Sequence, residues 1–170
     1  MKTVSITAAL SLATTMGLAA PLAAQDSASA QDVVAPDAVH YDEYGAVAEP
    51  LTETAGDAAA GQTVMTTRGL GNCVACHQVS VLDAVPFQGE IGPPLDGAGD
   101  RWTEADLRGI IANAKMTFEG SMMPSFYKSS GYIRPGNGFT GKAGTEPLPP
   151  LLTAQQVEDV VAYLLTLKEG

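Results

Sequence analysis

The stretch Cys73-Val74-Ala75-Cys76-His77 decides which fold this chain adopts. Its C-x-x-C-H spacing is the pattern in which two cysteine thiols bond covalently to one haem while the next histidine ligates the iron. The whole chain contains two cysteines and two histidines, and three of these four residues lie in this stretch. The motif therefore predicts one covalently bound haem c, held by Cys73 and Cys76 and ligated by His77.

Two other uses of these residues fit the sequence less well. A thioredoxin-like redox pair of Cys73 and Cys76 normally follows the strand of a βαβ unit, and no strand pattern precedes this motif. A structural zinc site needs four ligands, and only the distant His40 is left to supplement the cluster. We expect His40 to be a solvated loop residue, with a role as a rival haem ligand as the alternative.

Residues 1–30 have the organisation of a cleaved export signal. Lys2 precedes an uncharged stretch rich in alanine and leucine that runs from Val4 to Ala24. Serine and threonine residues dilute its apolar character, so we expect a signal peptide and no membrane anchor in the mature form. Ala28-Ser29-Ala30 matches the A-x-A cleavage pattern, with cleavage after Ala24 as the alternative. Because haem is joined to reduced thiols outside the cytoplasm, we expect a periplasmic protein.

The chain is strongly acidic, with 9 basic and 19 acidic residues and a formal charge of −10. This charge argues against nucleic acid as a partner. It either steers the protein toward basic faces of redox partners or only keeps it soluble. The segment 31–56 is acidic, contains Pro36 and Pro50, and has no lysine or arginine, so we predict an extension that is flexible by itself. Its Tyr41 and Tyr44 could pack on a partner or on the domain.

Residues 57–170 are expected to form one all-α domain with long loops and no substantial sheet. Three helices are predicted from N-terminal caps that are followed by apolar residues at helical spacing. The predicted caps are Asp57, Thr103 and Thr153.

A six-coordinate haem needs a second axial ligand, and a methionine is the expected donor. The loop from Lys115 to Thr153 is long for so small a domain, which is typical of functional loops. We predict Met123 as the ligand, because Pro124 stiffens the backbone that presents its sulfur. Met122 and Met116 are the alternatives.

Four features together resemble class I cytochromes c: the C-x-x-C-H stretch, Gly92-Pro93-Pro94-Leu95, Met123-Pro124 and a C-terminal amphipathic helix. The resemblance covers residues 57–170 and implies the class I cytochrome c fold. It further implies that the carbonyl of Pro93 accepts a hydrogen bond from Nδ1 of His77, and that Arg101 lies near a haem propionate. The alternatives are that Pro93 only shapes a turn and that Arg101 is a surface cation. The resemblance also implies that Gly61 packs against the last helix.

Other segments resemble a narrower family, the SoxX subunits of the SoxAX complex of thiosulfate-oxidising bacteria. These segments are Gly71-Asn72-Cys73, Met123-Pro124-Ser125-Phe126-Tyr127, Pro147-Leu148-Pro149-Pro150-Leu151 and Leu152-Thr153-Ala154-Gln155-Gln156-Val157.

The narrower resemblance implies a monohaem subunit bound to a SoxA-type cytochrome. The resulting complex is of the L-cysteine S-thiosulfotransferase type and joins thiosulfate oxidatively to a cysteine of a carrier protein. This chain would accept the electrons and pass them to a small soluble cytochrome c, while the sulfur-handling cysteine would belong to the partner. The alternatives are a free-standing periplasmic electron carrier and a ligand sensor or peroxidase in which Met123 leaves the iron.

Overall fold

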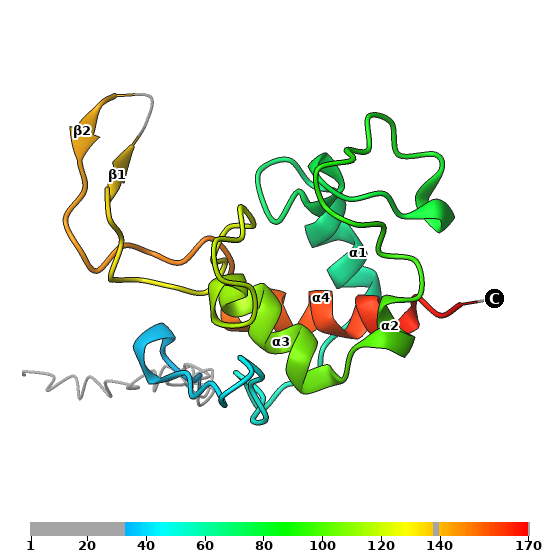
Figure 1. The fold of residues 1–170 in the computed structure, drawn as a ribbon, viewed down its shortest axis with the longest axis horizontal. Helices are drawn as coiled ribbons and strands as arrows, with labels where there is room; N and C mark the ends of the chain where they lie inside the picture. The colour runs from blue at the N-terminus through cyan, green and yellow to red at the C-terminus, as the bar shows by residue number, and fades with distance from the viewer. Residues whose placement is uncertain (1–32, 138–139, 170) are drawn as a thin grey trace, which may run out of the picture.

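The computed structural model describes residues 33–137 and 140–169, and helices form its core (Figure 1). Helix α4 (Ala154–Thr166) contacts both α1 (Ala58–Thr66) and α3 (Glu104–Asn113). The short helix α2 (Ala98–Arg101) packs near the C-terminal end of α4, where the N–H of Gly99 donates to the carbonyl of Leu167 at 2.9 Å. The predicted signal peptide, residues 1–30, lies outside the described residues.

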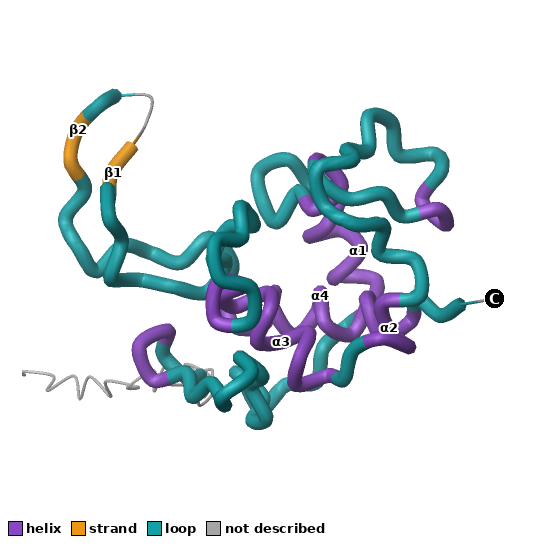
Figure 2. Tube along the Cα trace, in the orientation of Figure 1, coloured by secondary structure: helices purple, strands orange, loops and turns teal. Residues whose placement is uncertain are grey.

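Long loops join the helices, and these loops contain short 3-10 turns and one small ribbon (Figure 2). The turns are η1 (Pro36–Ala38), η2 (Cys73–Ala75), η3 (Ser80–Leu82) and η4 (Ala114–Met116). Strands β1 (Gly136–Asn137) and β2 (Lys142–Ala143) pair antiparallel, with Gly136 opposite Ala143. No other strand occurs in residues 33–137 and 140–169, so the predicted all-α class without a substantial sheet is confirmed. None of the described helices is long and apolar enough to cross a bilayer.

The three main helices begin at the predicted caps. The carboxylate of Asp57 accepts hydrogen bonds from the first backbone N–H groups of α1, at 2.7 and 3.2 Å. Capping boxes begin the other two helices: Thr103 pairs with Asp106 at α3, and Thr153 pairs with Gln156 at α4. Each cap satisfies N–H groups that have no partner inside the helix, which is why these sequence signals place the helix starts correctly.

Helices α1 and α4 cross at a glycine. A Cβ atom on Gly61 would lie 1.9 Å from the carbonyl oxygen of Asp159, so no larger residue fits without moving α4. The same Cβ would lie 3.0 Å from the Cβ of Tyr163. Met65, one turn further along α1, is fully buried. The contact that the resemblance implied between Gly61 and the last helix is therefore present, with Met65 and Tyr163 filling the space around it.

The acidic extension packs against the helical domain. Val47 and Leu51 are buried in the common core. The N–H of Val47 donates to the carbonyl of Ala105 at 3.0 Å, and the hydroxyl of Tyr127 donates to the carbonyl of Val34 at 2.7 Å. The sequence predicted a segment that is flexible by itself. The structure shows that residues 33–56 are ordered by contacts with the domain itself.

A buried ion pair fastens the extension to α3 and α4. Arg108 of α3 is only 2% exposed, and its guanidinium binds both carboxylate oxygens of Glu158 on α4, at 2.8 and 3.0 Å. The same guanidinium donates to the carbonyl of Val47 at 2.9 Å, and Glu158 accepts from the N–H of Leu51 at 2.8 Å. Burial opposes the charged form, but the hydrogen bonds and charges of Glu158 and Glu104 outweigh it and raise the pKa of Arg108.

A second glycine lets the extension approach α3 closely. A Cβ atom on Gly109 would lie 1.9 Å from the carbonyl oxygen of Gly45. Gly45 itself has φ +90°, a conformation that side chains with a Cβ rarely adopt. Backbone therefore packs directly on backbone at this point, one residue along α3 from Arg108.

Replacing Arg108 by methionine tests the buried pair. We expect the free energy of unfolding to fall by about 3–5 kcal/mol, because Glu158 is left as an unpaired buried carboxylate. Denaturant titration of the haem-loaded protein measures this change. The double variant Arg108→Met with Glu158→Leu should recover most of the loss, because it removes the unpaired charge as well.

The matched control is Arg68→Met, since Arg68 is an exposed arginine outside this network. Its unfolding free energy should stay within about 0.5 kcal/mol of the parent value. A loss below about 1 kcal/mol for Arg108→Met would contradict the buried network that we describe.

Candidate haem-binding site

The predicted site residues meet around one cavity of about 930 Å³. The cavity is lined by Cys73, Cys76, His77 and Met123, and by residues of α1, α3 and α4. Much of its wall is apolar, with Met65, Leu107, Ile110, Ile111, Phe126 and Leu164 among the lining residues. Its size and its mostly apolar wall suit a large flat ligand with a hydrophobic body. His40 is exposed in the extension and does not line the cavity.

The turn η2 places the two cysteines for a shared ligand. The N–H groups of Gly71 and Asn72 both donate to the carbonyl of Val64, at 3.1 and 3.3 Å, which ties the start of the turn to α1. Side chains three residues apart in a 3-10 turn lie above one another on the same face. Because Cys73 and Cys76 have this spacing, both thiols are directed to the same side of the turn, where the cavity lies.

The Cys73 thiol lacks the low pKa that is typical of a reactive redox cysteine. Both cysteines are free of any disulfide. Burial raises the pKa of the Cys73 thiol to about 11. Reactive C-x-x-C thiols show the opposite shift, toward a lower pKa. In addition, the described residues contain no group of three or more His, Cys, Asp and Glu side chains that could hold a metal ion, so a zinc site has no ligand set here.

Two residues of the loop before α2 orient His77. Nδ1 of His77 lies 2.7 Å from the carbonyl oxygen of Pro93, so the pair that the resemblance implied is in hydrogen-bond contact. A carbonyl oxygen can only accept, so Nδ1 carries the proton and Nε2 keeps its lone pair free for a metal. A Cβ atom on Gly92 would lie 2.2 Å from Cε1 of His77. The imidazole ring therefore lies directly against the backbone of Gly92.

Met123 reaches the cavity from the loop between α3 and the ribbon. It is partly buried and packs against the core, whereas Met122 is 83% exposed and Met116 is 48% exposed. Met122 also lines the cavity, at its rim. Met123 is thus the most buried of the three candidate methionines.

The loop around Met123 is fastened to the end of α3. The ammonium group of Lys115 donates to the carbonyl of Met123, and the N–H of Met123 donates to the hydroxyl of Ser121 at 3.2 Å. Ser125 donates to the side-chain oxygen of Asn113 at 2.7 Å. Sequence reasoning identified Pro124 as the stiffening residue and missed Lys115 and Asn113. Their spacing from Met123 gave no signal, because side-chain contacts of this kind depend on how the loop turns back.

Arg101 holds the loop that supports His77. Its guanidinium donates to the carbonyls of Asp96, at 2.5 Å, and Pro94, at 3.2 Å, and lies 3.7 Å from the carboxylate of Glu169. It also lines the cavity, where a cation would meet an acidic group of a ligand. The neighbouring Trp102 makes an edge-to-face contact with Phe118, with ring centroids 5.9 Å apart. Both aromatic rings line the cavity as well.

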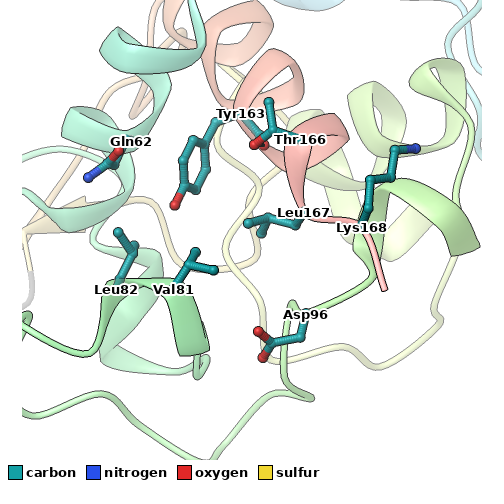
Figure 3. A pocket seen from close by; sticks show the side chains of 8 residues that line it. All are labelled: Gln62, Val81, Leu82, Asp96, Tyr163, Thr166, Leu167 and Lys168. Carbon is teal, nitrogen blue, oxygen red and sulfur yellow. Dashed lines mark hydrogen bonds between the residues drawn. The ribbon is translucent and has the colours of Figure 1, made fainter. Parts of the chain in front are cut away.

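The structure has a second, smaller cavity of about 370 Å³. Its wall is formed by α1, η3 and the end of α4, and Figure 3 shows the Tyr163 hydroxyl between Gln62 and Val81. Burial, and then the negative charge of Asp96, raise the pKa of Tyr163. Asp96 lines both cavities. None of the cysteine, histidine or methionine side chains of the predicted site lines this smaller space.

The comparisons with known proteins agree with this geometry. The sequence profile of the cytochrome c family matches residues 58–168. The chain belongs to the cytochrome c family. Its structure is similar to a chain in the crystal structure of SoxXA from P. pantotrophus, with 65% sequence identity and a TM-score of 0.76, covering 79% of this chain and 98% of that chain. The prediction of a class I c-type cytochrome that resembles SoxX is therefore confirmed.

A more distant relative is cytochrome c oxidase subunit 2 of Bacillus sp. (strain PS3), which is 28% identical over 97 residues. The match covers 57% of this chain but only 23% of that relative. Family membership implies a covalently bound haem c, and the residues around the larger cavity fit such a group. Two thiols on one face of a turn, an imidazole with a free Nε2 and a thioether all meet at an apolar space of suitable size.

The contact between Gly92 and His77 is testable with a matched pair of glycine variants. In Gly92→Ala the new methyl group displaces the imidazole, so we expect less haem per chain and a loss of about 1–3 kcal/mol in unfolding free energy. Haem absorbance per protein and denaturant titration measure the two effects. Gly69→Ala is the control, because a Cβ atom on Gly69 meets nothing within 4 Å. Equal haem content and stability in the two variants would contradict the role given to Gly92.

Proposed function

We propose that Cys73 and Cys76 bind one haem c and that His77 and Met123 are its two axial ligands. The observation that carries this proposal is that an imidazole and a thioether reach one apolar cavity from two separate loops. When bound, the haem supplies a one-electron couple at its iron. With His77 and Met123 both bound to the iron, no coordination position would be left for a substrate. The site therefore supports electron transfer and does not support chemistry on a ligand.

The side chains around the cavity would favour the reduced state of a bound haem iron. Met123 offers a neutral thioether, which raises the reduction potential relative to an anionic or second imidazole ligand. The apolar residues on the cavity wall disfavour additional positive charge at its centre. His77 is held by Pro93 with its proton on Nδ1, so its orientation is set before any electron arrives. These residues suit a chain that accepts electrons and releases them to a further acceptor.

We infer that the chain is the monohaem subunit of a SoxAX-like complex in the periplasm. The inference is supported by 65% identity to a chain of the SoxXA structure over 98% of that chain, and by the predicted export signal. In this role its partner is a SoxA-type cytochrome subunit. Both cysteines of this chain lie in the haem motif, so the cysteine that handles sulfur belongs to the partner.

The proposed reaction is that of an L-cysteine S-thiosulfotransferase-type complex. Thiosulfate is joined to a cysteine thiol of a sulfur-carrier protein: an S–H bond breaks, an S–S bond forms, one proton goes to solvent and two electrons leave. This chain has a single attachment motif, so it takes these electrons one at a time. It passes each electron to a small soluble cytochrome c. This transfer leaves the chain ready to accept the next electron.

The axial role of Met123 is tested with the haem-loaded chain. In Met123→Ala we expect the methionine-sulfur charge-transfer band of the ferric protein to disappear and the reduction potential to fall. Met122→Ala is the matched control and should keep both the band and the potential, because its side chain is 83% exposed. If the band persists in Met123→Ala, the ligand is Met122 or Met116 and the assignment is wrong.

The division of labour is tested by purifying the protein from its native source. We expect it to co-purify with a second haem-bearing subunit, and we expect thiosulfate to reduce the haem of this complex in the presence of the carrier protein. The isolated chain should conjugate no thiosulfate. Conjugation by the isolated chain at the rate of the complex would contradict the proposal. A monomer that retains no second subunit would favour a free-standing electron carrier.

A further inference from the structure

One part of the chain projects away from the helical domain. We name the residues 128–137 and 140–148 the basic arm; they form a ribbon around β1 and β2 that extends to one side of the molecule (Figures 1 and 2). Its strands pair at Gly136 with Ala143 and at Asn137 with Lys142, and the N–H of Gly144 donates to the carbonyl of Pro135 at 2.8 Å. A two-stranded ribbon of this size gains little stability from its own pairing. Contact with a second molecule would stabilise it.

The root of the basic arm is held firmly. The carboxylate of Glu146 accepts from the N–H groups of Gly131 and Tyr132, at 3.1 and 2.9 Å, which closes the arm at its base. The carboxylate of Asp37, in the extension, accepts from the hydroxyl of Ser129 at 2.7 Å. The extension thus braces the arm against the domain. A braced root fixes the direction in which the arm points, which lowers the entropy lost on docking.

The charge of the basic arm is opposite to that of the rest of the protein. The chain has 9 basic and 19 acidic residues, yet the arm contains Lys128, Arg134 and Lys142 and only one acidic residue, Glu146 at its root. Arg134 and Lys142 are exposed. Ile133, next to Arg134, is 99% exposed. The arm therefore presents cations and one apolar side chain to its surroundings.

We infer that the basic arm docks onto an acidic surface of the haem-bearing partner subunit, with Ile133 entering an apolar depression of that surface. The inference rests on the proposed function, because it takes the partner from there. Charge complementarity indicates what binds the arm. The formal charge of −10 on the chain repels nucleic acid, anionic lipid and a second copy of this chain at long range. An acidic patch on a different protein fits the cations of the arm.

The position of the basic arm suits electron transfer. Its root follows directly on the loop that carries Met123, and that loop is joined to α3 by hydrogen bonds from the N–H groups of Phe126 and Tyr127 to the carbonyls of Ile111 and Ala112, at 3.3 and 3.0 Å. A partner held by the arm is thereby placed on the side of the molecule where Met123 lines the cavity. Docking at this position would bring the partner to the loop that carries the proposed iron ligand Met123.

The test compares charge reversal in the basic arm with charge reversal elsewhere. The haem-loaded chain is titrated with the haem-bearing subunit that co-purifies with it, at low and at high salt. For the double variant Arg134→Glu with Lys142→Glu we expect Kd to rise by at least about tenfold and its salt dependence to weaken. Ile133→Ser should raise Kd as well. The matched controls are Arg68→Glu and Phe87→Ser, at exposed positions outside the arm, and their Kd should stay within about twofold of the parent value.

The ferric charge-transfer band and the unfolding midpoint show that each variant is folded, since no arm residue in the test lines the cavity. If the arm variants bind the partner as tightly as the parent chain does, the docking inference is wrong and the proposed function stands. If the parent chain itself fails to bind that subunit, both the proposed complex and the docking inference are wrong. Self-association of the parent chain that the arm variants lose would assign the arm to a second copy and overturn the inference.

Discussion

The buried pair of Arg108 and Glu158 is the contact on which the arrangement of this protein depends. It joins α3 to α4 and binds the backbone of the extension at Val47 and Leu51. A buried charge is tolerated only where partners satisfy it, so both side chains hold their neighbours in one geometry. The extension in turn contacts Tyr127 and the root of the basic arm. Segments far apart in the sequence are thus positioned through one guanidinium.

Separate hydrogen bonds give the larger cavity a defined shape. Its wall is built partly from loops, and these loops are tied to neighbouring elements. The turn η2 is tied to α1 through the carbonyl of Val64, and the Met123 loop is tied to α3 through Asn113 and to η4 through Lys115. Arg101 fixes the loop that orients His77. In the proposed haem site, donors that are held in this way would move little when an electron is gained or lost.

Sequence reasoning succeeded where the signal is local. The helix caps at Asp57, Thr103 and Thr153 depend on neighbouring residues only, and all three are present. For the extension, the acidic composition predicted a segment that is flexible by itself and left open whether it packs on a partner or on the domain. Val47 and Leu51 lack any periodic pattern, and they are buried because α3 and α4 offer a second apolar face together with a buried ion pair. Arg108 and Glu158 are charged residues that no hydrophobic pattern could have placed in the interior.

The sequence by itself determined the haem motif and the helices, because covalent spacing and capping act over a few residues. It also limited the second donor to three methionines that follow the motif. Only the tertiary structure showed that Met123 is partly buried against the core while Met122 is exposed at the rim of the cavity, since both positions depend on how the loop folds back on α3. The packing of the extension and the direction of the basic arm were likewise decided by contacts between distant segments, which leave no local pattern in the chain.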